Sequence, residues 1–361
     1  MVIKMSKKNI IVDVHVIQTV PPSCINRDDV GSPKTARYGG VTRARISSQC
    51  WKKAIRVEFE ALGLGSKYLG FRTSKIPKMV ADAMMQQDTS LTEDVALKKG
   101  EDAIKVISNG LVKNGKMSAI TFMSQAQINA IAEVALSGKT SKTDYVKAWT
   151  ENPSVDMALF GRMLASVPDF NVDAAAQVSH VLSTHEVQTE YDFYTATDDM
   201  LGDNEAGAVN LGTLEFQSST LYRHANVNVN LLRTNLLGDD DLTVESVVNF
   251  VKAFVLSMPQ AKQTSYANRT VPDMVYVTIR NDQSLNLVNA FESAVKYNDG
   301  YTQASIHQFV DFAKKQYDLF DMSPVKSYVI GDYDFGDFAE SKNLLQMLDA
   351  VKEDVDALLK G

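Results

Sequence analysis

The sequence predicts an α+β fold with helices packed on a sheet, because strand-like and helix-like patterns alternate around one long helical stretch. Val- and Ile-rich or alternating runs predict strands at residues 9–18, 222–232, 274–280 and 327–330. Amphipathic runs predict helices at residues 244–258, 304–317 and 338–359. Residues 67–150 have a mostly helical pattern and are interpreted as an insertion. A ferredoxin-like sheet that binds nucleic acid fits this order. The Gly-aromatic signature of ordinary RNA-recognition sheets is missing, so if RNA binds, it binds through loops and the helix after Ser47 and not through a standard sheet face.

The first strand, residues 9–18, is expected to be central because it is rich in Val and Ile. Residues 19–45 contain Pro and Gly pairs and are predicted to be irregular. Ser47 and Ser48 precede a helical run, and a serine there can accept hydrogen bonds from the first amides of the helix. Three apolar side chains share one face of that helix: Trp51, Ile55 and Phe59.

The middle of the chain contains one polar segment between packed ones. Residues 156–168 are predicted to pack in the core, and residues 174–184 to form a buried helix or strand. Residues 186–212 carry many acids and three aromatic residues, so we predict a protruding hairpin or loop. These aromatic residues are Tyr191, Phe193 and Tyr194.

Composition narrows the class of protein. The 361 residues contain no charged-then-apolar leader and no apolar run near the roughly 18 residues that cross a bilayer. The two cysteines, Cys24 and Cys50, do not make a disulfide framework. We therefore expect a cytoplasmic protein without a membrane partner.

Charge is distributed unevenly. The net charge is -7, yet residues 30–57 contain seven of the 37 basic residues and no acidic one, which leaves 30 basic against 44 acidic residues elsewhere. A local positive field on an acidic body is typical of a directed anion site, although a solvated helix face would give the same count. The seven residues are Lys34, Arg37, Arg43, Arg45, Lys52, Lys53 and Arg56.

These residues suit the phosphates of a nucleic-acid strand. The basic side chains supply donors at successive points, and Ser47, Ser48 and Gln49 stand at a helix N-terminus, where free amides attract phosphate oxygens. Arg27 lies at the start of the same segment and is included in the predicted site. Lysines and arginines hold phosphates without reading sequence, so affinity should depend strongly on salt.

Two other kinds of site were weighed. His180, His185 and Glu186 do not follow the metalloprotease order, neither cysteine has a ligand-like spacing, and no phosphate-binding P-loop is present, so neither a metal nor a cofactor is predicted. The rival function is a metal-dependent endoribonuclease that uses Asp28 and Asp29 beside the basic segment. The structural alternative is that these aspartates bond loop amides or pair with Arg27. A plain assembly scaffold with incidental charge is a third possibility.

Ordered blocks across the chain resemble a known family. They are SCINRDD (23–29), YGG (38–40), RARISSQCWKKAIR (43–56), DMALFGRM (156–163), THEV with YDFYTATDD (184–199), LGTLEF with YRHANVN (211–228) and AKQTSYA (261–267). Together they resemble the CasC-type backbone subunit of the type I-E CRISPR Cascade complex. Residues 65–150 and 331–361 match poorly.

The resemblance implies a hand-shaped protein with an RNA-recognition-like palm, a helical fingers insertion and a β-hairpin thumb. The corresponding segments are palm 1–62, fingers 63–152, palm 153–186, thumb 187–217 and palm 218–361. It implies a non-catalytic subunit whose partners are the CRISPR guide RNA, the target DNA strand through the guide, further copies of itself and other Cascade subunits. Related type III backbone subunits cut RNA with a loop aspartate, which is the source of the rival function.

The resemblance also assigns residues. Palm residues of the family match Lys34, Arg45, Ser47, Ser48, Gln49 and Lys52. Met163 matches a methionine near the bent nucleotide, although taken alone it reads as a core residue. The thumb tip matches Phe193, Tyr194 and Thr195, and the family often has Trp at the first of these. Lys262 and Gln263 fall in another matched block. For target DNA, the candidates are the finger lysines Lys139, Lys142 and Lys147.

Overall fold

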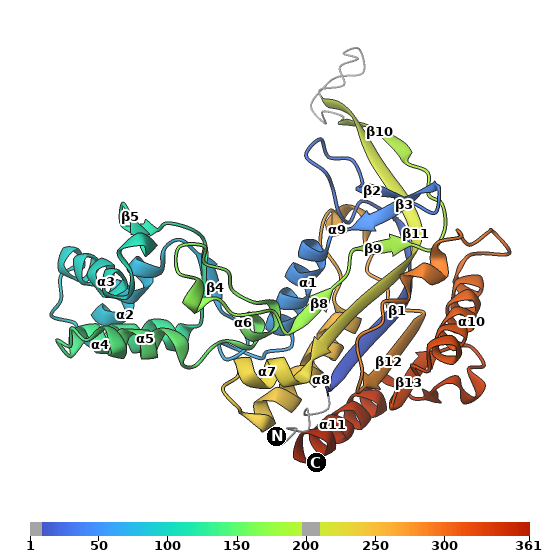
Figure 1. The fold of residues 1–361 in the computed structure, drawn as a ribbon. Helices are drawn as coiled ribbons and strands as arrows, with labels where there is room; N and C mark the ends of the chain where they lie inside the picture. Colours follow the sequence, from blue (N-terminus) through green and yellow to red (C-terminus); the bar gives the residue numbers. More distant parts are fainter. Residues whose placement is uncertain (1–8, 197–209) are drawn as a thin grey trace, which may run out of the picture. The chain divides into compact units, whose positions relative to one another are not determined.

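The computed structural model describes residues 9–196 and 210–361, which form a mixed α+β fold with a ten-stranded sheet and eleven α-helices (Figure 1). The chain divides into two compact units, and each is described by itself. The first holds the residues up to 55, then 178–226 and 251–351; the second holds 56–177, 227–250 and 352–361. None of the described helices is long and apolar enough to span a membrane.

The large sheet dominates the first unit. Its strands are β1 (Ile11–Ser23), β2 (Thr35–Tyr38), β3 (Val41–Ile46), β8 (Ala176–Val178), β9 (Val181–Ser183), β10 (Glu190–Ala196), β11 (Asn210–Asn228), β12 (Met274–Arg280), β13 (Lys326–Gly331) and β14 (Glu340–Ser341). The order is β14-β13-β12-β1-β11-β9-β3-β2, and β8 and β10 also pair with β11. The predicted central strand is confirmed, because β1 lies between β12 and β11.

Helix α10 (Thr302–Phe320) covers one face of this sheet and closes the core of the first unit (Figure 1). Its Phe309 packs with Ile17, Tyr276 and Val329 from three strands, and all four side chains are fully buried. The other helices that lie at least partly in this unit are α1 (Ser48–Ala61), α8 (Asp240–Leu256), α9 (Gln263–Tyr266), α11 (Leu344–Lys360) and the 3-10 helices Leu287–Phe291 and Gly336–Phe338.

The second unit is mainly helical, as the pattern of residues 67–150 predicted. Its helices are α2 (Ile76–Gln87), α3 (Glu93–Ile107), α4 (Gln125–Leu136), α5 (Lys142–Thr150), α6 (Val155–Phe160), α7 (Val229–Asn235) and the 3-10 helices Asn109–Leu111 and Pro168–Phe170. Two small two-stranded sheets accompany them. One pairs β4 (Phe71–Thr73) with β7 (Thr121–Met123), and the other is the hairpin of β5 (Val112–Lys113) and β6 (Lys116–Met117). Trp149 and Ile131 are fully buried in the core of this unit.

Three predictions for single segments were wrong. Residues 19–45 are not irregular throughout: β1 continues to Ser23, and β2 and β3 form a hairpin. Gly39 and Gly40 both have positive φ, which a tight two-residue hairpin turn requires. The strand predicted at 222–232 ends at Asn228, whose side chain accepts from Leu231 N and starts α7. The last helix begins at Leu344, after the short strand β14.

Candidate nucleic-acid interface

Asn26 accepts hydrogen bonds from two parts of the basic segment in the first unit. Its backbone carbonyl accepts from Lys34 N at 2.8 Å, and its Oδ1 accepts from Ser47 N at 2.8 Å. Lys34 O in turn accepts from Arg45 N at 2.9 Å. Three predicted site residues that are far apart in the loop and hairpin are therefore fixed around one asparagine. We call Lys34, Arg45, Ser47 and Lys53 the basic cluster.

The N-terminus of α1 lies in this cluster. Ser47 Oγ accepts from Cys50 N at 3.2 Å, which confirms the predicted capping serine. The first amides of a helix have no partner within it, and they carry the positive end of the helix dipole. Ser48 is half-buried and Gln49 is exposed at this end. The arrangement can hold an anion with backbone and side-chain donors together.

A buried arginine anchors this end of α1. Arg223 of β11 is fully buried and its guanidinium lies over the rings of Trp51 and Phe254, at 4.1 and 4.7 Å from their centroids. It donates to Gln18 Oε1 at 2.5 Å and to the Phe254 carbonyl. Burial lowers the pKa of Arg223 well below its ordinary value. This buried position of Arg223 could not be predicted from the sequence, because an arginine on an alternating strand is normally assigned to the exposed face.

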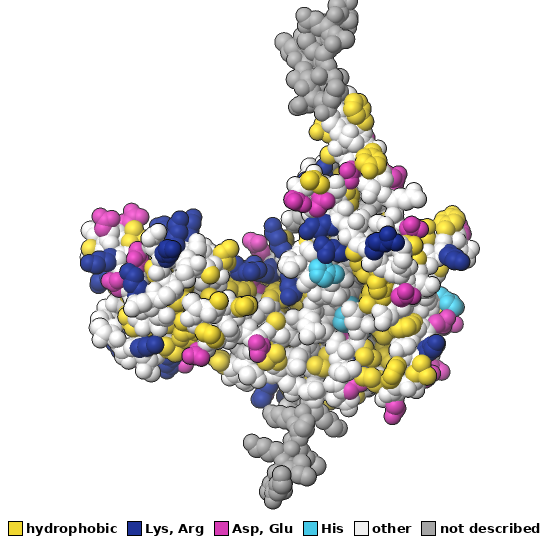
Figure 2. Space-filling model, turned by 45° about the horizontal axis from the view of Figure 1, so that its top comes forward, with side chains coloured by type: hydrophobic (Ala, Val, Ile, Leu, Met, Phe, Trp, Pro, Cys, Tyr) yellow, Lys and Arg dark blue, Asp and Glu magenta, His cyan; other side chains and the backbone are white. Residues whose placement is uncertain are grey.

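Two pKa shifts indicate that the cations of the basic cluster lie near one another. The pKa of His180 is lowered by burial first, and then by Arg45 and Lys34. Burial raises the pKa of the Cys50 thiol, against the opposing effect of Lys53 and Lys34. Figure 2 shows lysine and arginine side chains (dark blue) gathered below the base of the projecting hairpin, with a histidine (cyan) beside them. This surface is suited to an anion.

Arg45 also points polar atoms into a small pocket, which Ser23, Asn26 and Gln217 line with it. Arg45 Nε and Gln217 Oε1 are buried and have no hydrogen-bond partner among the residues that the structure describes. Buried polar groups normally have partners. The two atoms are therefore available to a ligand or to water.

Two arginines of the predicted RNA site make hydrogen bonds within the fold instead. Arg43 is fully buried and donates to the carbonyls of Ser183 (2.9 Å), Phe291 (2.8 Å), Glu292 (3.4 Å) and Tyr38 (3.3 Å). Arg56 Nε donates to the buried carboxylate of Asp156 at 2.8 Å, and its Nη2 donates to Gly70 O at 2.8 Å. Both arginines were predicted to contact RNA, and we correct that interpretation: the two guanidiniums are hydrogen-bonded within the fold.

The other basic residues differ in exposure. Arg37 is exposed and donates to Gly40 O at 2.9 Å, so it supports the hairpin turn. Arg27 and Lys53 are exposed, and Lys52 is half-buried.

A short helix brings a further predicted pair to the same side of the sheet. Lys262 precedes α9 in a left-handed conformation (φ 51°), and Gln263 begins the helix. The charges of Lys262 and Arg27 both act on the thiol of Cys24, so these two cations lie near the same loop. The Tyr266 ring lies 6.3 Å from that of Phe216 at the root of the hairpin.

The predicted protrusion is a hairpin of β10 and β11 (Figure 1). Phe193, Tyr194 and Thr195 are exposed and pair with Thr213, Gly212 and Leu211 within the strands. Residues 197–209, with the acids Asp198, Asp199, Asp203 and Glu205, lie outside the described residues. Phe193 and Tyr194 face opposite sides, because successive strand residues alternate. A Cβ on Gly212 would stand 2.4 Å from the Tyr194 ring, so that ring lies against the partner strand.

The remaining predicted residues belong to the second unit. Met163 is 82% exposed, which overturns its reading as a core residue, and it lines a pocket with Arg72, Phe122 and Phe160. The three finger lysines, Lys139, Lys142 and Lys147, are exposed. Lys147 Nζ lies 3.8 Å from Glu151.

One aspartate of the rival nuclease site is hydrogen-bonded within its own loop. Asp28 Oδ1 accepts from Val30 N at 3.1 Å and from Ser32 N at 2.9 Å, as the structural alternative predicted. Asp29 is exposed. Among the described residues, the one group that could hold a metal is Asp13, His15 and His224, which the sequence reasoning missed.

The fold and the basic cluster define an α+β protein with a basic surface beside a projecting hairpin. The chain belongs to the family described as CT1975-like protein, whose model matches residues 12–354. It is also similar to a solved chain of a "CRISPR RNA-guided surveillance complex, pre-nicking", with 29% identity, a TM-score of 0.83, and coverage of 96% of this chain and 100% of that chain. A chain of a "CRISPR RNA-guided surveillance complex" matches with 28% identity, a TM-score of 0.63, and coverage of 94% and 99%. No curated protein sequence matches the chain.

Proposed function

We propose that this protein is the RNA-binding backbone subunit of a type I-E CRISPR surveillance complex. It would coat the guide RNA as one of several identical copies in the cytoplasm, bind the other subunits, and perform no chemistry itself. The observation that carries the proposal is the basic cluster, in which Asn26 fixes Lys34, Arg45 and Ser47 at a helix N-terminus. The similarity to chains of CRISPR RNA-guided surveillance complexes supports the choice of guide RNA as the anion.

Each part of the molecule has a role in this proposal. The large sheet is assigned to a ferredoxin-like palm, the helices of the second unit to the fingers, and the β10–β11 hairpin to the thumb. Lys34, Lys53 and the amides of Ser48 and Gln49 would hold successive phosphates without reading bases. Arg45 Nε is a buried donor without a partner among the described residues and would bind a phosphate, and Gln217 Oε1 is a buried acceptor that would bind a sugar hydroxyl. Exposed Phe193 would wedge against a base, since stacking on an aromatic ring contributes roughly 1–3 kcal/mol.

Assembly along a strand needs a head-to-tail contact between different surfaces of successive copies. The hairpin is the most suitable protrusion, and its described acids Glu190 and Asp192 are exposed beside its aromatic residues. They would meet the basic cluster of the next copy.

The experiment is co-expression of the chain with a CRISPR array, followed by purification and sizing of the RNA that it retains. We expect RNA of one discrete length in regular arrays by electron microscopy. Deletion of residues 191–204 should leave a folded chain that binds short RNA but forms no long arrays. Phe193→Ala is the milder matched variant, which should form arrays with a lower RNA affinity. Regular arrays from the deletion variant would show that this hairpin is not the thumb.

The rival function is tested on the same preparation. Incubation of guide-paired RNA with Mg²⁺ or Mn²⁺ should leave the RNA intact. The amide bonds of Asp28 favour this outcome, because its Oδ1 is already used by two loop amides. Metal-dependent cleavage that Asp29→Ala abolishes would establish the nuclease instead.

A further inference from the structure

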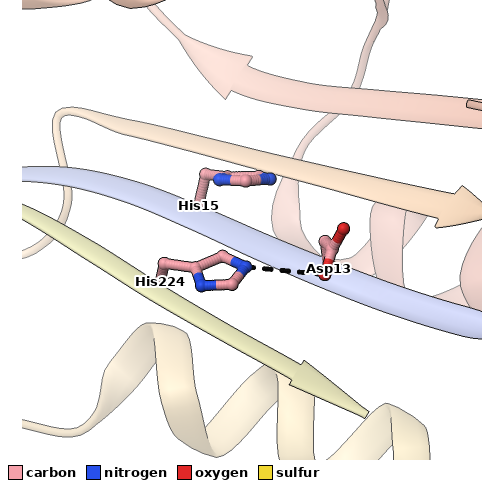
Figure 3. A group of neighbouring side chains, drawn as sticks. All are labelled: Asp13, His15 and His224. Carbon is pink, nitrogen blue, oxygen red and sulfur yellow. Dashed lines mark ion pairs between the residues drawn. The ribbon is translucent and has the colours of Figure 1, made fainter. Parts of the chain in front are cut away.

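Asp13, His15 and His224 lie together inside the sheet of the first unit, away from the basic cluster (Figure 3). Asp13 and His15 are on β1, His224 is on the neighbouring β11, and all three are buried, with exposed fractions of 0%, 1% and 4%. One ligand atom from each lies within 4.8 Å of the others. The proposed function uses none of these residues.

We propose that these three side chains bind one divalent transition-metal ion of the Zn²⁺ kind, which joins β1 to β11. The ligands are His15 Nε2, His224 Nε2 and a carboxylate oxygen of Asp13. Two imidazoles and a carboxylate suit zinc and its first-row neighbours. The role is structural, because the site is buried and strand β11 also carries the projecting hairpin.

The spacing of the donor atoms fits an ion. A tetrahedral ion with bonds of about 2.0–2.1 Å holds its ligand atoms about 3.4 Å apart. His224 Nε2 lies 3.5 Å from Asp13 Oδ1, which is long for a hydrogen bond and close to that separation. Figure 3 shows both imidazole rings extending in the same direction, with one nitrogen of each toward Asp13. The rings lie 4.9 Å apart between centroids.

The surroundings orient these ligands. His15 Nδ1 lies 2.8 Å from the Tyr222 hydroxyl, which also accepts from Leu287 N at 3.1 Å. Donation from Nδ1–H to that oxygen leaves the lone pair of His15 on Nε2. Asp13 accepts from Ser284 Oγ at 2.5 Å and from Leu285 N at 3.0 Å, and the Asn226 amide donates to Ser284 Oγ at 2.8 Å. Metal ligands are commonly held by such outer hydrogen bonds.

The cluster also leaves polar atoms unpaired. His224 Nε2 and Thr278 Oγ1 are buried without a hydrogen-bond partner among the described residues. Thr278 is opposite Asp13 in the β1–β12 register, so its hydroxyl is a candidate for the fourth position, directly or through water. A buried carboxylate and two unpaired groups are costly together, and a bound cation removes both costs.

One nearby charge opposes a cation. Arg280 is buried on the next strand, and it contributes to lowering the pKa of His15, behind burial and His224. However, Arg280 is paired with Asp282 through two contacts of 2.9 and 2.7 Å, so much of its charge is balanced.

The test is elemental analysis of the purified full chain after dialysis against a weak chelator. We expect about one equivalent of metal per chain, with Zn²⁺ as the ion for reconstitution. Asp13→Asn and His224→Gln should each lower the occupancy by at least about tenfold. The matched control is His307→Ala, which removes an exposed histidine 3.1 Å from Asp311 and should leave the metal content unchanged.

A second measurement does not depend on variants that could misfold. Removal of metal from the wild-type chain with a strong chelator should lower its thermal midpoint, and added Zn²⁺ should restore it. Tetrahedral Co²⁺ in its place should give visible absorption. A wild-type chain without stoichiometric metal, or metal that follows His307, would overturn the proposal. Loss of RNA binding with the metal intact would instead count against the proposed function.

Discussion

The basic segment of the first unit and the lysine-bearing stretch around α5 in the second unit have the same kind of charge but different support. In the basic segment, backbone and side-chain hydrogen bonds fix Lys34, Arg45 and Ser47 around Asn26. Around α5, the side chains of Lys139, Lys142 and Lys147 extend into solvent, and Lys147 Nζ lies 3.8 Å from Glu151. In the basic segment, the bonds around Asn26 fix the backbone that carries the cations, so less backbone entropy is lost when this segment binds a phosphate than when a free segment does.

The comparison separates three uses of a basic residue. Arg43 is enclosed by four carbonyls and serves the fold. Arg45 is partly enclosed and keeps an unpaired buried Nε. Lys139, Lys142 and Lys147 are exposed and belong neither to the buried contacts of the fold nor to the basic cluster. Substitutions at the three kinds of position should therefore affect different properties: stability, RNA affinity or DNA affinity.

The largest effect should come from Arg43→Ala. It removes donors from four carbonyls in a buried place, so the free energy of unfolding should fall by about 3 kcal/mol or more. Urea unfolding of the purified chain measures this. Arg37→Ala, on the same hairpin but exposed, is the control and should change the free energy by less than about 0.5 kcal/mol. Equal stability of the two variants would show that Arg43 does not hold the hairpin.

The next effect concerns RNA affinity. The double variant Lys34→Ala and Arg45→Ala should weaken binding to all single-stranded RNA sequences alike, and should reduce the slope of log K against log salt by about 0.7 per lost contact. Lys315→Ala, an exposed lysine of α10, is the matched control. Fluorescence titrations at several salt concentrations measure the slopes. A loss confined to one RNA sequence would contradict the phosphate interpretation.

The sequence predicted the order of the main elements well, and for physical reasons. Strand β12 was predicted at its observed bounds, because the run MVYVTIR is rich in β-branched and aromatic residues, and all seven of its residues are buried. The β2–β3 hairpin was missed because Thr, Arg and Tyr interrupt the apolar residues of its strands, and because Arg43, although charged, is buried. The Gly39–Gly40 pair was read only as loop punctuation, although its two positive φ angles make the hairpin turn.

The candidate site was predictable in residue type but not in role. A run of seven cations gave the location, yet sequence alone could not show that Arg43 and Arg56 point into the fold. Asn26 was missed, because its importance comes from contacts 8 and 21 residues away. The Asp13–His15–His224 cluster was missed for the same reason: His224 is far from the other two in sequence, and only strand pairing brings them together.

A smaller effect concerns the pH dependence of stability, and it comes from His185, which lies near Arg43. Its Nδ1 donates to Glu186 O at 2.7 Å and its Nε2 accepts from Thr220 N at 3.1 Å, so the fold requires the neutral ring. Burial first, and the charge of Arg43 as well, lower the pKa of His185 below its ordinary value of 6.5. The neutral ring thus stabilises the fold above pH 6.5, and this contribution is lost as pH falls through the lowered pKa. Compared with the wild type, His185→Gln should unfold with a flatter pH dependence between about pH 7 and 5 in urea titrations. Parallel curves would refute this role.

The smallest effect should come from the triple variant of Lys139, Lys142 and Lys147 to alanine. Exposed lysines contribute little to stability, so the free energy of unfolding should change by less than about 0.5 kcal/mol. Binding of guide RNA should also be unchanged, because none of the three belongs to the basic cluster. If these lysines hold the target strand, the assembled complex should bind target DNA more weakly, with a salt slope reduced by up to about one unit per lysine.

A triple variant of Lys98, Lys99 and Lys113, exposed lysines of the same unit, supplies the same change in net charge. Equal losses from the two triple variants would mean that only the overall charge of this unit attracts DNA. A loss of guide RNA binding from the first variant alone would place the α5 lysines on the RNA path and remove the contrast between the two regions.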